Sequence, residues 1–283
     1  MLGQDLTAVL RPSHEVLALD RRACDVSDES MVRRAFREFS PELVVNCAAF
    51  TDVDGCETDP ERAFAVNARG AGHVARAAEQ VGARVFYIST DFVFDGEKHE
   101  SYREDDPTGP VNVYGRSKLE GEKQTFGPNV GRTPHAVIRT SWLYGLHGSN
   151  FVEWVLAQAE LPQPDIVTVA DQISSPTWTL HLARKIAELA GTAAGGVLHA
   201  VNGGGCSRQE MAQAIVDQVR RGVSVGATYW TKLNRPARRP AYSVLGCSRL
   251  SELGLDPLPD WREALAEYLR TRRAAAAPKA RSS

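Results

Sequence analysis

The chain has 283 residues, 43% of them hydrophobic and 24% charged, and its 33 basic and 35 acidic side chains give a net charge of −2. This composition is typical of a globular protein with a full core and argues against disorder, a nucleic-acid-binding surface and a membrane patch. No apolar run is long enough to cross a bilayer. The five cysteines are widely spaced and no histidines have metal-ligand spacing. We therefore expect reduced thiols, a cytoplasmic location and no metal.

Predicted helices and strands alternate in the first part of the chain, which is typical of an α/β sheet. Helices are predicted from the spacing of apolar residues or from a capping residue, and strands from continuous apolar stretches. In chain order we expect a helix over 2–10, a strand over 14–20, a helix capped by Ser27 or Asp28 that runs to Phe39, a strand over 43–49 and a helix over 60–81.

The next predicted strand, residues 84–91, is apolar, aromatic and β-branched and ends in hydroxyl residues. In an open α/β sheet, ligands bind at the carboxyl ends of the strands, so we expect Thr90 to lie at a ligand site. A plain turn that closes the strand would have the same composition.

The stretch from Asn112 to Glu122 is interpreted as helical, which places Tyr114 and Lys118 one turn apart on the same face. An ammonium close to a phenol favours the phenolate, so we expect Lys118 to lower the pKa of Tyr114 and make it a general acid. Tyr-x-x-x-Lys alone is a weak signal, and a surface tyrosine beside a solvated lysine is the alternative.

The alternation of helices and strands weakens from Asn150 onward. A strand over 135–145 contains Trp142, which is either a core aromatic or a wall of the ligand site. We expect residues 1–149 to bind nucleotide and residues 150–273 to form a smaller, intertwined part that mainly binds substrate. The last helix is predicted over 260–273, and the small, basic tail 274–283 is expected to be disordered.

Two stretches, STDFVFDG at 89–96 and VNVYGRSKLEGE at 111–122, resemble the extended short-chain dehydrogenase/reductase superfamily, and within it the dTDP-4-dehydrorhamnose reductase family. The resemblance runs from Met1 to about Leu269. It implies a Rossmann-like, doubly wound parallel sheet. It also implies a monomeric or homodimeric enzyme that uses NADPH or NADH to reduce the C4 keto group of dTDP-4-dehydro-L-rhamnose, in nucleotide-sugar and cell-surface polysaccharide biosynthesis.

The resemblance also implies roles for individual residues. Tyr114 would protonate the forming alkoxide, Thr90 would hydrogen-bond the same oxygen, and Lys118 would also hold the nicotinamide ribose. Arg239 would meet the diphosphate of the substrate. The implied cofactor-binding residues are Leu2, Gly3, Asp20, Asp25, Val26, Ala48, Ala49, Thr51, Tyr114 and Lys118, and the implied substrate-binding residues are Thr51, Val53, Thr90, Asp91, Phe92, Trp142 and Arg239.

The amino end departs from the family pattern. Relatives begin with a hydrophobic strand and a G-x-x-G-x-x-G turn whose amides hold the pyrophosphate, and here only Gly3 matches, as the third glycine. We therefore expect that the strand and turn before Met1 were cut off by a late start codon. A chain shortened in this way is expected to fold poorly and to bind the pyrophosphate weakly.

Three other functions are compatible with parts of the pattern. A 4,6-dehydratase would need a glutamate where Phe92 stands, so that activity is disfavoured. A nucleotide-sugar 4-epimerase would keep its NAD bound, and its distinguishing loop would lie before Met1. The regulatory subunit of methionine adenosyltransferase, a binding protein, resembles the same family; the absent glycine turn favours this alternative, whereas Thr90, Tyr114, Lys118 and Trp142 favour an enzyme.

Overall fold

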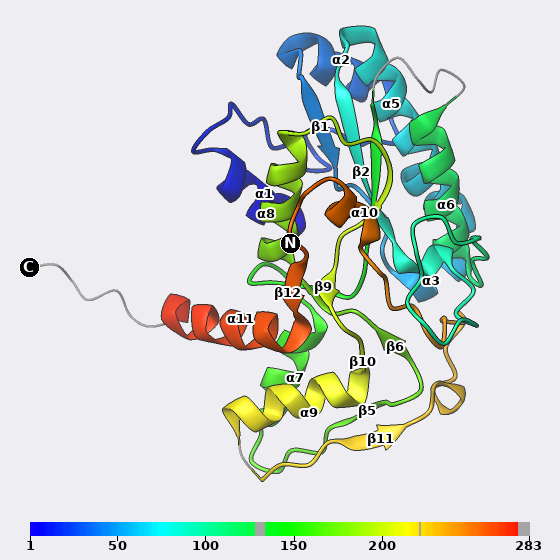
Figure 1. Cartoon of the computed structure of the whole chain (residues 1–283). Helices are drawn as coiled ribbons and strands as arrows, with labels where there is room; N and C mark the ends of the chain where they lie inside the picture. The colour runs from blue at the N-terminus through cyan, green and yellow to red at the C-terminus, as the bar shows by residue number, and fades with distance from the viewer. Residues whose placement is uncertain (128–133, 221, 277–283) are drawn as a thin grey trace, which may run out of the picture.

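A parallel sheet of four strands, in the order β1-β2-β3-β8, forms the centre of the molecule (Figure 1). The computed structural model describes residues 1–127, 134–220 and 222–276. The strands are β1 (Leu43–Asn46), β2 (Arg84–Thr90), β3 (Ala136–Thr140) and β8 (Gly196–His199). The two central strands are almost wholly buried, because helices cover both faces of the sheet.

Helices pack on both faces of this sheet, as the doubly wound prediction requires. One face carries α1 (Leu2–Leu10) and α8 (Thr179–Ala190), whose leucines and isoleucine join Phe86 and Ile138 in one core. The other face carries α2 (Glu29–Phe39), α5 (Gly70–Val81) and α6 (Val113–Phe126) (Figure 1). The α/β fold class predicted from the sequence is confirmed.

The predicted strand over 14–20 is wrong. Residues 15–20 form no strand, and Leu17 and Leu19 are 47% and 45% exposed. A strand is stable only where a neighbouring strand supplies backbone partners, and in the described part of the chain β1 is an edge strand that pairs with β2 alone.

Three short helical elements connect β1 to α5. They are α3 (Val53–Thr58), α4 (Pro60–Phe64) and a π-helical turn, η1 (Ala65–Arg69), which leads directly into α5. The predicted helix over 60–81 is therefore continuous but contains a π-helical turn. That turn includes Asn67, whose side chain is fully buried.

The second half of the chain forms a smaller lobe and also returns to the sheet. Its core contains Trp178, Tyr144 and Trp261. Because α8 and β8 belong to the sheet layer, the two halves are intertwined. The remaining elements are η2 (Asp91–Val93), β4 (Leu143–Tyr144), α7 (Phe151–Ala159), β5 (Val167–Val169), β6 (Ile173–Ser174), β7 (Thr177–Trp178), β9 (Asn202–Gly203), β10 (Cys206–Ser207), α9 (Arg208–Val219), β11 (Gly226–Thr228), η3 (Trp230–Lys232), α10 (Ser248–Glu252), β12 (Leu258–Asp260) and α11 (Trp261–Ala276).

The last helix, α11, ends at Ala276, so residues 274–276 of the predicted disordered tail are helical. Alanine has the highest helix propensity, which explains the extension. Residues 277–283 lie outside the described residues. Within the described ranges, no helix is long and apolar enough to span a membrane.

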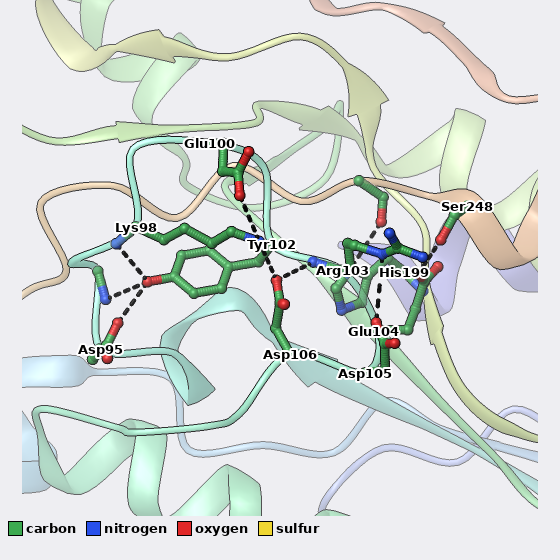
Figure 2. A network of polar contacts seen from close by, with 12 residues as sticks. Asp95, Lys98, Glu100, Tyr102, Arg103, Glu104, Asp105, Asp106, His199 and Ser248 are labelled. Atoms are coloured by element: carbon green, nitrogen blue, oxygen red, sulfur yellow. Dashed lines mark hydrogen bonds and ion pairs between the residues drawn. The ribbon is translucent and has the colours of Figure 1, made fainter.

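The loop between β2 and α6 is fixed by side-chain hydrogen bonds (Figure 2). The Tyr102 hydroxyl donates to Asp95 (2.6 Å) and accepts from the amides of Gly96 and Lys98. Farther along, the buried Glu104 carboxylate accepts from the Ser248 hydroxyl (2.7 Å) at the start of α10. These contacts fix the path of the chain into α6.

Candidate active site

Helix α6 begins directly above the carboxyl end of β2. Asn112 caps it, accepting from the Gly115 amide (2.7 Å) and donating to the Arg238 carbonyl (2.7 Å). A Cβ at Gly115 would lie only 2.1 Å from the Phe92 carbonyl oxygen, so only glycine permits this approach. As a result, Tyr114 is placed beside the turn that follows Thr90.

Tyr114 is partly buried among apolar side chains. Its ring meets the Phe92 ring edge-on, with 5.8 Å between centroids, and packs against the cluster formed by Cys56, Ala63 and Val113. Burial raises the pKa of the Tyr114 phenol above its usual value, and a hydrogen bond with the Thr90 side chain opposes that rise. The phenol is therefore protonated at neutral pH.

Lys118 lies one turn later and is 1% exposed. Its ammonium donates to the Ile88 carbonyl (2.7 Å) and lies 4.0 Å from the centroid of the Tyr87 ring. Burial lowers the pKa of this ammonium to about 7, and the Glu122 carboxylate opposes the decrease. The expectation that Lys118 lowers the pKa of Tyr114 is wrong for this structure. Burial has the largest effect on the pKa of the phenol, and the Lys118 ammonium hydrogen-bonds the Ile88 carbonyl of β2.

A buried ion pair holds α6 against the sheet below Lys118. The Glu122 carboxylate accepts from Arg139 Nε (2.9 Å) and Nη2 (2.8 Å) and from the Ser89 hydroxyl (2.6 Å). Sequence analysis missed this pair. The available signal was that Glu122 continues the Tyr114–Lys118 face at the same four-residue spacing.

Asn67 makes a second connection between α6 and the end of β1. Its side chain accepts from the Phe50 amide (2.8 Å) and donates to the Phe50 carbonyl (3.1 Å) and the Ser117 hydroxyl (2.9 Å). The amide thus ties the π-helical turn to the loop after β1 and to the helix that carries Tyr114.

The Asp91 carboxylate connects the sheet to the smaller lobe. It is buried and accepts from the hydroxyls of Ser243 (2.5 Å), Ser174 (2.9 Å) and Thr90 (3.0 Å). Burial raises the pKa of this carboxyl, against the effect of the three hydrogen bonds. Asp91 was expected to contact substrate, and in the structure its carboxylate hydrogen-bonds three hydroxyl groups of the protein.

Trp142 follows β3 by two residues, and the last residue of β3, Thr140, is in register with Thr90. Trp142 has a φ of 41°, which a bulky side chain rarely adopts. The Thr177 amide, which donates to the Trp142 carbonyl (3.3 Å), stabilises this conformation. The ring is only partly buried, and the guanidinium of Arg208, which sequence analysis also missed, lies over it.

Arg239 was expected to meet a diphosphate, and in the structure it forms a two-point ion pair with Asp54. Its Nη1 and Nη2 atoms lie 3.0 and 2.9 Å from the two carboxylate oxygens. Arg235 approaches the same carboxylate at 3.4 Å. The pair brings this loop to the start of α3, which begins at Val53, two residues after Thr51.

The residues expected to hold a dinucleotide fall into two groups. In the first, α1 begins without a side-chain cap, a Cβ at Gly3 would meet no atom within 4 Å, and Ala48 and Ala49 follow β1. Uncapped amides at a helix N-terminus and small residues suit a pyrophosphate. Together with Lys118, these residues fit a nicotinamide dinucleotide.

The second group lies at the expected adenosine side and makes local contacts. Asp20 is exposed and accepts from the amides of Arg22 and Ala23 (both 2.9 Å). Asp25 accepts from Ser27 and pairs with Arg21 (3.0 Å). Val26 packs against Gly70 of α5, where an added Cβ would lie 2.8 Å from the valine.

A parallel sheet covered on both faces, with a tyrosine and a buried lysine one turn apart at its carboxyl edge, defines an α/β protein of the Rossmann type. The family model described as RmlD substrate binding domain matches residues 1–274. The chain belongs to this family.

Named relatives match over nearly the whole chain. A dTDP-4-dehydrorhamnose reductase of Streptomyces griseus is 43% identical over 94% of this chain and 89% of that protein. The spore coat polysaccharide biosynthesis protein SpsK of Bacillus subtilis is 40% identical over 97% of this chain and 95% of that protein. A solved structure of dTDP-4-dehydrorhamnose reductase from Bacillus anthracis, in complex with NADP, is 35% identical with a TM-score of 0.91, covering 95% of each chain.

Proposed function

We propose that this chain uses NADPH or NADH to reduce the C4 keto group of dTDP-4-dehydro-L-rhamnose to dTDP-L-rhamnose. The observation that carries the proposal is the protonated Tyr114 phenol beside Thr90, one turn from a buried ammonium, in a chain of this family. Relatives with the reductase name at 37–43% identity support the substrate, and a neighbour bound to NADP supports the cofactor.

The Tyr114 hydroxyl donates a hydrogen bond to the keto oxygen of the substrate. The Thr90 hydroxyl, which donates to Asp91 in this structure, turns to donate to the same oxygen. The C4 carbon would receive its hydride from a reduced nicotinamide bound beside Lys118. Tyr114 transfers its proton to the oxygen as negative charge develops there, so the carbonyl gains one hydride and one proton. The phenol is protonated before the reaction, as a donor must be. Because burial raises its pKa and makes it a weaker acid, the proton transfer depends on the negative charge that develops on the keto oxygen.

The placement of Leu2, Gly3, Ala48, Ala49 and Lys118 supports the proposed cofactor contacts. The first amides of α1, at Leu2 and Gly3, would hold the pyrophosphate, Ala48, Ala49 and Thr51 would line its path, and Lys118 would bind the nicotinamide ribose. Residues 1–149 thus bind mainly the dinucleotide, and residues 150–273 mainly the sugar nucleotide.

Phe92 argues against a dehydratase. Its ring packs against Tyr114, so no carboxylate stands at that position to move a proton at the sugar's C5 and C6. Among the residues that the structure describes, no feature favours an epimerase or a regulatory subunit over the reductase.

The test is to mix the purified chain with dTDP-4-dehydro-L-rhamnose and NADPH and to follow the loss of NADPH absorbance. We expect stoichiometric oxidation and formation of dTDP-L-rhamnose, identified by mass spectrometry and chromatography. A folded protein that binds both ligands without oxidising NADPH would overturn the reductase assignment.

A further inference from the structure

Arg208 lies at the start of α9, where it stacks on two aromatic rings. Its guanidinium carbon is 3.6 Å from the centroid of the Trp142 ring and 4.6 Å from that of Phe151. The backbone here is fixed by a capping box between Ser207 and Glu210. Stacking uses the flat face of the guanidinium and leaves the N–H groups at its edge free to donate.

No protein group in the described part of the chain uses those donors. Within residues 1–127, 134–220 and 222–276, the Arg208 guanidinium makes no hydrogen bond and no ion pair, although protein atoms surround it closely enough to lower its pKa to about 10. A desolvated cation without a counter-ion is unfavourable, so its retention here indicates an anionic ligand.

The charged side chains around Arg208 also favour an anionic ligand. Arg235 and Arg239 are close enough to Arg208 to repel it electrostatically. Both already share the Asp54 carboxylate. Asp91 also interacts with Arg208, but three hydroxyls already hydrogen-bond its carboxylate. The region therefore has an excess of positive charge.

We propose that Arg208 binds the substrate's diphosphate, at the phosphate next to the sugar. The inference rests on the proposed function, which places the C4 carbonyl at Thr90 and Tyr114. The diphosphate is attached at C1, across the ring from C4, so this phosphate lies one ring length from the reacting carbonyl. Arg208 stacks on Trp142, which lies two residues after Thr140 of β3, and Thr140 is the register partner of Thr90.

The geometry suits a phosphate group. A planar guanidinium donates two parallel hydrogen bonds to phosphate oxygens, and the two aromatic rings hold it in place before the ligand arrives. Arg208, and not Arg239, is then the cation that is available for the diphosphate, because Arg239 already has a carboxylate partner.

The experiment measures binding of dTDP, which carries the diphosphate but no sugar, by titration calorimetry. Arg208→Gln keeps a polar side chain and removes the charge. Arg208→Lys keeps the charge but removes the planar guanidinium that donates two parallel hydrogen bonds. Arg262→Gln is the matched control, because Arg262 also stacks on a tryptophan, at 4.3 Å from the Trp261 centroid, but is exposed. NADPH binding and thermal melting are measured on each protein.

We expect Arg208→Gln to weaken dTDP binding by roughly 10- to 100-fold, with Arg208→Lys intermediate and Arg262→Gln unchanged. NADPH affinity and melting temperature should stay the same in all variants. Wild-type affinity for dTDP in a folded Arg208→Gln variant would overturn the assignment of Arg208 alone. Loss of dTDP affinity without any keto-sugar reduction by the wild type would uphold Arg208 and overturn the reductase. A wild-type chain that binds no dTDP would overturn both.

Discussion

Tyr114 is the side chain on which the proposed reaction depends most directly. Tyr114→Phe removes one hydroxyl and leaves the packing of the ring against Phe92 intact. We expect kcat to fall by about 10²–10⁴-fold, because the proton donor is gone, with little change in cofactor affinity or melting temperature. Steady-state kinetics with the keto-sugar, alongside thermal melting, measures both effects. Turnover within a few-fold of wild type would remove Tyr114 from the mechanism.

Lys118 has a pKa that makes stability depend on pH. Burial lowers it from 10.5 to about 7, so between these values the unfolded chain binds more protons at this group than the folded chain. The free energy of unfolding then rises with pH through this window, by up to about 1.4 kcal/mol per pH unit. The stability cost of the buried ammonium is greatest below pH 7 and disappears above pH 10.5.

Lys118→Met removes this dependence. We expect the stability of the variant relative to wild type to be highest near pH 6 and to decline toward pH 10. Denaturant unfolding across this range measures it. Lys123→Met, which removes an exposed lysine of the same helix, is the control and should follow wild type. Parallel pH profiles for Lys118→Met and wild type would contradict the lowered pKa.

Helix α6 positions both Tyr114 and Lys118, and the Glu122–Arg139 pair fixes it to β3. Both side chains are 5% exposed. Removing one partner leaves a buried charge without compensation, which costs about 3–5 kcal/mol. We expect Glu122→Gln to lower the free energy of unfolding by this amount in urea titrations. Arg33→Gln, which breaks an exposed pair with Glu29, should cost less than about 1 kcal/mol. Equal effects of the two substitutions would show that the buried pair does not stabilise the helix.

Across the whole molecule, the two halves share one hydrophobic core. Leu182, Ile186 and Leu198, from the second half, pack against Phe86 and Ile138 of the sheet. We expect residues 1–149 expressed alone to lack a cooperative thermal transition, because β3 loses its β8 neighbour and one face of the sheet loses α8. Circular dichroism melting checks this against the full chain. A cooperative transition of the fragment would show that the first half is an independent domain.

The sequence alone determined the elements whose signals are local. The composition of the run from Arg84 to Thr90 predicts β2, because apolar and β-branched residues favour a buried strand. The four-residue spacing then places Tyr114 and Lys118 on one face whatever the rest of the chain does. The alternation of helices and strands predicted only an α/β sheet, and the family motifs predicted its Rossmann-like, doubly wound form.

Only the tertiary structure decided the features that depend on partners distant in sequence. Residues 14–20 have a strand-like composition, but a strand needs a neighbour, and none pairs with them in the described chain. The direction of the Tyr114 pKa shift follows from burial, which spacing cannot reveal. Arg239 pairs with Asp54, whereas Arg208 stacks on Trp142 and has no hydrogen-bond partner among the described residues. Packing of the smaller lobe against the sheet determines which arginine meets a carboxylate.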